Sequence, residues 1–193
     1  VLAPTAVAGA AELVDAGWWW RVQAGGPAPI PAPPNVPPGG LMVQGAPDGP
    51  TALAAVRFVV PPGDTNPVLT LALAQGGDQG ASDGVVLACP AASPWSGGDA
   101  QAWSSRPELR CDSPIRGELS ADAGTITFAL GFVPPSGVID VVLTPGTSDG
   151  QPFSGTNGST FSLALAPPRG RRGAVREEQQ EQGERDERAG DRR

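Results

Sequence analysis

Short apolar runs separated by glycine and proline dominate this chain and limit what it can fold into. With 27 glycines and 23 prolines in 193 residues, few stretches run far enough without a turn-forming residue to build a helix. Several runs alternate apolar and polar side chains, as half-buried strands do. They occupy residues 41–44, 51–60, 68–74, 85–88, 117–119, 125–132, 138–143 and 161–166. Short strands at this regular spacing predict an all-β sandwich.

Alternation within the runs predicts which side chains face the core. In residues 51–60, Phe58 shares the more consistently apolar face with Ala54 and Val56, so this face should pack inward. Arg57 lies on the other face, and we expect it to point outward, where it can pair with a carboxylate of a neighbouring strand. The same alternation gives the later run 125–132 one apolar face: Ile126, Phe128 and Leu130.

The two cysteines, Cys89 and Cys111, are 22 positions apart. A zinc site needs four ligands, and the chain has no histidine to complete one. The spacing also excludes a C-x-x-C redox motif. One structural disulfide or two unrelated buried thiols remain, and in an oxidising compartment we expect the disulfide. Closing such a loop contributes about 3 kcal/mol. The loop is rich in Gly, Ser, Pro and Ala, so we expect few of its own side chains to be buried.

The ends of the chain differ in character from its centre. Residues 1–12 predict either a signal-peptide remnant or a flexible N-terminus. The β-sandwich domain is assigned to residues 13–166, with an extended proline-rich connector at 24–40. The charged segment 167–193 predicts a disordered linker or tail, with a lone charged helix as the alternative. No apolar stretch reaches 18 residues, so we expect no transmembrane segment within the chain.

Three consecutive tryptophans mark residues 18–20. In an extended strand, Trp18 and Trp20 share one face and Trp19 lies on the other. We expect one face to pack into the core. The other should either bind a ligand or cover a sheet edge.

Charge and composition exclude several classes of function. Residues 1–167 hold five arginines against thirteen acidic residues, which makes nucleic acid a poor partner. The lack of histidine and lysine excludes a Ser-His-Asp triad, Schiff-base chemistry and a P-loop. A carboxylate pair for glycoside hydrolysis is the remaining option. All the candidate carboxylates except Asp140 lie in or beside turn-like sequence, and we expect no enzyme: Asp78, Asp83, Asp99, Glu108, Asp112, Glu118 and Asp140. The Ala, Gly, Pro and Arg bias indicates a GC-rich, actinobacterial genome.

Two groups of residues are candidates for binding. Asp78 and Asp83 lie in the Gly-rich stretch 76–84 and offer oxygen ligands for calcium, although a plain Asp-Gly hairpin loop explains them more simply. No other cofactor is expected.

The second group lies between the cysteines. Trp95 and Trp103, with Asp99 and Arg106 nearby, form the mixture of apolar rings and polar groups that contacts sugars. The alternative is that these tryptophans lie in the core.

Three segments resemble the DNRLRE-type bacterial surface module. In residues 51–74 an arginine in R-F-x-V leads into a Pro/Gly turn and an L-x-L strand. Residues 95–107 contain W-x-x-G and W-x-x-R-P, and residues 139–166 are similar to the family's closing strands. The resemblance covers roughly residues 41–166. It implies an antiparallel jelly-roll-like β-sandwich on a secreted or surface protein, and polysaccharide binding in some members.

These features predict a non-catalytic module that is extracellular or anchored at the cell surface. Its expected partner is a polysaccharide or cell-wall component, bound through Trp95, Trp103, Asp99 and Arg106 in the loop between the two cysteines. The alternative is a structural spacer or adhesion domain with no small ligand.

Overall fold

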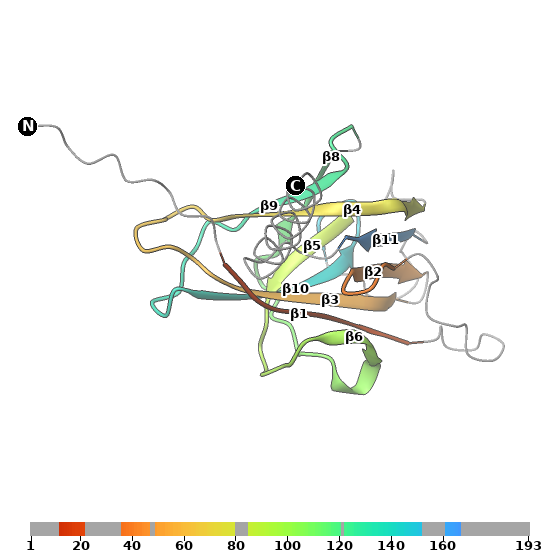
Figure 1. Ribbon diagram of the computed structural model, residues 1–193, viewed down its shortest axis with the longest axis horizontal. Helices are drawn as coiled ribbons and strands as arrows, with labels where there is room; N and C mark the ends of the chain where they lie inside the picture. The colour runs from red at the N-terminus through yellow and green to blue at the C-terminus, as the bar shows by residue number, and fades with distance from the viewer. Residues whose placement is uncertain are drawn as a thin grey trace, which may run out of the picture.

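The computed structural model describes residues 12–21, 36–46, 49–79, 85–120, 122–151 and 161–166, and these residues form an all-β structure (Figure 1). The strands are β1 (Glu12–Trp20), β2 (Leu41–Ala46), β3 (Gly49–Val59), β4 (Val68–Gln79), β5 (Val85–Pro90), β6 (Gly98–Ala102), β7 (Ile115–Arg116), β8 (Glu118–Ser120), β9 (Thr125–Ala129), β10 (Val138–Gly146) and β11 (Phe161–Leu165). A 3-10 turn, η1 (Trp103–Ser105), follows β6. The predicted all-β class is confirmed.

The strands pair as the nested hairpins of a jelly roll. β2 pairs with β11, β3 with β10, β4 with β9 and β5 with β7, and every pair is antiparallel. Two further antiparallel pairs, β4 with β11 and β5 with β10, assemble the strands into two sheets. Their orders are β2-β11-β4-β9 and β3-β10-β5-β7. This nesting is the jelly-roll sandwich that the sequence predicted.

The two sheets are joined along both edges. β2 pairs with the start of β3 on one side, and β8 continues β7 and pairs with β9 on the other. Gly117 lies between β7 and β8, where a Cβ atom would come within 2.7 Å of the Ile126 and Phe128 side chains. Only glycine therefore lets the chain cross over the core at this point.

The main core lies between the two sheets. Phe58 is 3% exposed and Phe128 is fully buried. Ile126 and Leu130 join them, so the predicted inward faces are confirmed. Much of the rest of this core comes from aliphatic side chains of β2, β10 and β11: Leu41, Met42, Val43, Ile139, Val141, Leu143, Leu163 and Leu165.

Two strands extend the second sheet beyond β3. β1 runs antiparallel to β3, and β6 runs parallel to β1. Figure 1 shows β6 beyond β1, with its loop below the sheet. Because β6 and η1 both belong to the segment between the two cysteines, this segment has regular structure that the sequence did not predict.

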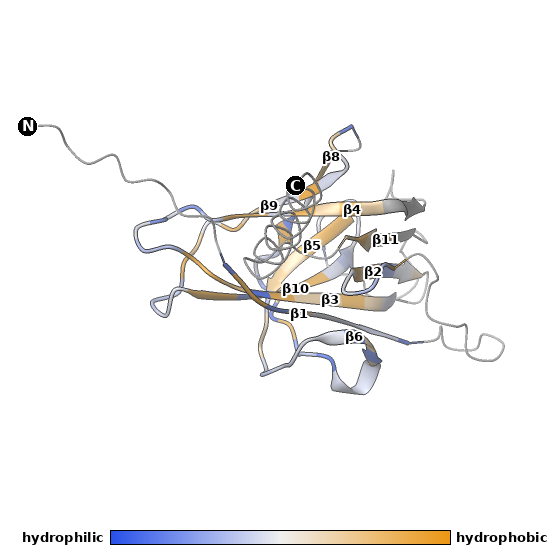
Figure 2. Cartoon of the chain, in the orientation of Figure 1, coloured by the Kyte–Doolittle hydropathy of each residue, from blue (hydrophilic) through white to orange (hydrophobic). Residues whose placement is uncertain are grey.

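The outer face of the second sheet carries a second core. Leu53 and Ala55 of β3 pack there with Val142 of β10, and Trp19 and Trp95 complete the cluster. β3 is thus buried on both faces. Figure 2 shows the apolar colouring along β3, β5 and β10, whereas the β6 segment below them in this view is paler. As expected, the loop between the cysteines buries few of its own residues: only Trp95 and Pro107 in residues 90–110 are buried. The sequence did not predict that this loop covers an apolar face of the sheet.

The tryptophan run alternates as predicted. Trp18 is 3% exposed and belongs to the main core, against which Trp20 also packs. Trp19 is fully buried in the second core on the opposite face. Both faces of β1 are therefore used for packing.

The structure differs from the sequence prediction between β4 and β5. β4 continues to Gln79, so Asp78 lies in the strand, opposite Leu163, and not in a turn. β4 and β5 do not pair with each other in the sheet, so these two strands do not form the expected hairpin.

Several predictions lie outside the described residues. They are the N-terminal residues 1–11, most of the connector 24–40, the calcium candidate Asp83, and the charged segment 167–193. Residues 36–40 of the connector are described, and they form a turn in which the Gly40 N–H donates to the Pro37 carbonyl at 2.8 Å.

Candidate functional site

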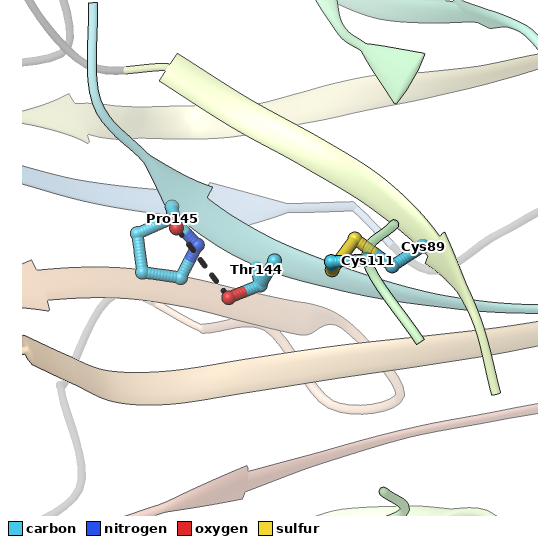
Figure 3. The surroundings of a disulfide bond; sticks show 4 residues. All are labelled: Cys89, Cys111, Thr144 and Pro145. Atoms are coloured by element: carbon cyan, nitrogen blue, oxygen red, sulfur yellow. Dashed lines mark hydrogen bonds between the residues drawn. A yellow bond between two sulfur atoms is a disulfide. The ribbon is translucent and has the colours of Figure 1, made fainter. Parts of the chain in front are cut away.

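The segment between the cysteines is joined to the sheet by a disulfide. Cys89, fully buried in β5, bonds to Cys111 across a Cα–Cα distance of 5.1 Å, which confirms the predicted pairing. Val85, Leu87 and Leu109 pack around the two sulfur atoms. Figure 3 shows the disulfide beside Thr144 of the neighbouring strand β10. We call residues 90–110 the stapled loop.

Trp95 fixes the loop to the sheet. The Trp95 side chain is 9% exposed, and its ring meets that of Trp19 edge to face at a centroid distance of 5.9 Å. Its indole N–H has no hydrogen-bond partner among the described residues. An aromatic ring in this position packs as a core residue, so Trp95 does not offer an exposed face to a sugar.

An ion network lies beside Trp95. Arg57 Nε donates to Asp140 Oδ1 at 2.7 Å, and Arg57 Nη1 lies 3.8 Å from Asp15 Oδ2. The guanidinium carbon is 4.7 Å from the centre of the Trp95 ring. Asp15 also accepts the N–H of Gly97 at 3.0 Å, so the network holds the loop as well as the strands.

Arg57 lies on the predicted face of β3, but the sequence did not predict what covers this face. Its side chain lies on the face opposite Phe58, as predicted, and pairs with carboxylates of both neighbouring strands. Only 25% of that side chain is exposed, because the stapled loop covers this face. Period-two alternation assigns a face and does not reveal what lies over it.

Asp99 has a structural contact in the loop. Its Oδ2 accepts the N–H of Gly39 at 3.0 Å, which ties the start of β6 to the turn at residues 36–40. Gln101 folds back on the loop and donates to the carbonyl of Ser96 at 3.1 Å. Neither side chain is described in contact with Trp103.

Trp103 is the tryptophan of the loop that remains partly exposed. It opens η1, and two guanidinium groups lie over its ring. The guanidinium carbon of Arg106 is 4.6 Å from the ring centre, and that of Arg21 is 5.0 Å away. Arg106 also donates to the Trp103 carbonyl at 3.0 Å, and Arg21 Nε donates to the Pro50 carbonyl at 2.9 Å. We call Trp103, Arg21 and Arg106 the indole–guanidinium cluster.

The structure thus divides the four predicted ligand-binding residues. Trp103 and Arg106 come together, Trp95 lies in the second core, and Asp99 holds the adjacent turn. Sequence reasoning missed Arg21. Alternation along β1 places Arg21 on the same face as Trp19. The sequence does not show that the stapled loop, and with it Trp103, lies over this face.

Acidic residues give little support for a metal site. Among the described residues, no three His, Cys, Asp or Glu side chains gather where they could hold a metal ion. Asp78 is in β4, and its calcium partner Asp83 is not described. Asp149 lies in the exposed turn after β10, where a hydrogen bond from the Thr147 hydroxyl lowers the pKa of its carboxyl group.

Comparison with known proteins leaves the chain without an assigned family. No protein-family model matches it, and no curated protein has significant sequence similarity to it. Within the described residues, no helix has the length and apolar character needed to cross a membrane.

Proposed function

We propose that this chain is a non-catalytic extracellular or cell-surface module that binds a polysaccharide or cell-wall component through the stapled loop. The observation that carries the proposal is Trp103, a partly exposed indole flanked by Arg21 and Arg106. Indole C–H surfaces contact the apolar faces of sugars, and guanidinium N–H groups bind sugar oxygens. The jelly roll supplies a rigid support.

The anchoring of the loop supports this proposal. The disulfide holds its ends, Trp95 and Gly97 hold its middle, and Asp99 ties it to the turn at residues 36–40. A surface fixed at so many points loses little conformational entropy when a ligand binds.

The extracellular assignment is supported by the disulfide. Disulfides persist in oxidising compartments and are rare in the cytosol, and Cys89 and Cys111 are bonded. The resemblance to DNRLRE-type surface modules agrees with this location.

Affinity electrophoresis of the full chain against soluble glycans, with a cell-wall pull-down, tests the function. We expect retardation by at least one polymer, and Trp103→Ala should abolish it. Ser104→Ala changes the exposed neighbouring residue and serves as the matched control. If the intact chain shows no retention on any glycan or wall preparation, with or without calcium, the proposal is wrong.

A structural spacer is the second candidate, and the burial of Trp18, Trp19 and Trp95 favours it. Acrylamide quenching of tryptophan fluorescence separates the two functions. The binding function predicts a quenchable component that Trp103→Phe removes and that a bound oligosaccharide protects. The spacer function predicts that no oligosaccharide changes the quenching of Trp103.

A further inference from the structure

Two of the five arginines in residues 1–167 meet at one aromatic ring. Arg21 follows β1 and Arg106 follows η1, so the chain brings them together from distant positions. This convergence places two positive charges over one indole in a part of the chain that carries thirteen acidic residues.

No acidic group of the described residues forms an ion pair with Arg21 or Arg106. Among the described residues, the salt bridges all involve Arg57, and no carboxylate lies within 4.0 Å of a nitrogen of Arg21 or Arg106. Each guanidinium makes one described side-chain hydrogen bond, Arg21 to Pro50 and Arg106 to Trp103. A guanidinium has five N–H groups, so each keeps donors that these bonds do not use.

The contact with Trp103 orients those donors. A guanidinium lying over an aromatic ring uses its face for the ring, and its N–H groups lie along its edge, where they match carboxylate or phosphate oxygens. Because the backbone carbonyls of Pro50 and Trp103 hold the two side chains in place, less rotamer entropy is lost on binding. The cluster has the form of an anion site.

The charge of the surrounding protein limits which anions fit. A dense polyanion would bring many negative charges to a protein whose residues 1–167 hold five arginines against thirteen acidic residues. At physiological salt, charges farther apart than about 8–10 Å are screened, whereas closer like charges repel. One carboxylate or phosphate on an otherwise neutral chain meets Arg21 and Arg106 and brings few other charges to this acidic protein.

We propose that the indole–guanidinium cluster binds an isolated anionic group, a carboxylate or phosphate, carried on an otherwise neutral polysaccharide. The inference rests on the proposed function and names its ligand class. Arg21 and Arg106 bind the anion, and the exposed part of Trp103 contacts the adjoining sugar.

Isothermal titration of the full chain with matched polymers tests the inference. Glucuronoxylan is compared with the same polymer after its carboxyl groups are reduced, and a phosphorylated mannan with its dephosphorylated form. We expect the acidic member of one pair to bind at least about tenfold more tightly than its neutral form, since hydrogen bonds to charged groups are the stronger ones. The pair that shows the difference identifies the anion.

Variants that replace one arginine by neutral glutamine show which arginines cause the preference for the acidic polymer. Arg21→Gln and Arg106→Gln should each remove most of the preference for the acidic polymer. Arg116→Gln makes the same change of charge in β7, where the side chain donates to Ser148, and should preserve the preference. Equal binding of the acidic and neutral members in both pairs overturns the inference and leaves glycan binding in place. Binding to none of the four polymers, nor to the wider glycan and wall panel, overturns both.

Discussion

Arg57 Nε donates a 2.7 Å hydrogen bond to Oδ1 of Asp140, the residue directly opposite it in the β3–β10 pair. On its other side, Arg57 also faces Asp15 of β1. One arginine thus pairs with both neighbouring strands. Through Asp15 and Trp95, it also contacts the groups that hold the stapled loop.

This relationship predicts that Arg57→Met destabilises the fold. The substitution leaves two carboxylates without their cation, and hydrogen bonds between charged groups are worth about 1.5–3 kcal/mol when protected from water. The three side chains are 25–32% exposed, so solvent screening reduces the expected loss to about 1–2 kcal/mol. Urea unfolding measures it. Arg116→Met is the control, and an equal effect of both variants would contradict the importance of the network.

Phe58 should contribute more to the stability of the fold than its neighbour Val59. Phe58 is 3% exposed in the main core, and removing a buried phenylalanine side chain costs about 3–5 kcal/mol. Val59 is 39% exposed on the opposite face, so Val59→Ala should change the free energy of unfolding by less than about 1 kcal/mol. Chemical unfolding of Phe58→Ala and Val59→Ala compares them. Equal losses would show that the register of β3 is reversed.

The sequence predicts the sandwich well because its signals are local. Alternation in β3 and β9 identifies the inward faces, and the apolar runs locate the strands that form the two sheets of the jelly roll. Turn residues and hydrophobic period act over a few neighbouring positions, so a single sequence contains them.

The covered outer face could not be predicted in the same way. Leu53 and Ala55 share a face with Arg57, and alternation alone gives no reason for that face to be buried. Its cover comes from Trp95, forty positions away, through contacts that depend on the path of the stapled loop. Likewise, Arg21 reaches Trp103 only because β6 runs beside β1. Long-range packing of this kind leaves no local pattern.

Removing the disulfide should loosen the stapled loop and destabilise the fold. Native protein should show no reactive thiol, and Cys89→Ala combined with Cys111→Ala should lower the free energy of unfolding by about 3 kcal/mol. Urea unfolding of oxidised and reduced wild type, with the double variant as control, measures the loss. The reductant should not affect the double variant. Two reactive thiols in the native protein would contradict the bond.

Gly97→Ala tests whether the stapled loop is docked on the sheet. A Cβ atom at Gly97 would collide with the Asp15 carboxylate and the Ala16 carbonyl, and the Gly97 N–H bond to Asp15 would be strained. Overpacking of this kind costs about 1–3 kcal/mol, which lifting the loop can relieve. We therefore expect a lower melting temperature and a Trp95 ring that acrylamide can reach.

The readout is quenching of tryptophan fluorescence in a Trp103→Phe background, where the tryptophans of the main and second cores dominate the signal. Ser96→Ala alters the exposed residue beside Gly97 and should leave both quenching and melting unchanged. Gly97 is not one of the residues that make up the main core, so Gly97→Ala should retain the far-ultraviolet spectrum of the β-sandwich. If quenching in Gly97→Ala stays at the level of the Ser96→Ala control, the close approach of Gly97 to Asp15 is not what keeps Trp95 docked on the sheet.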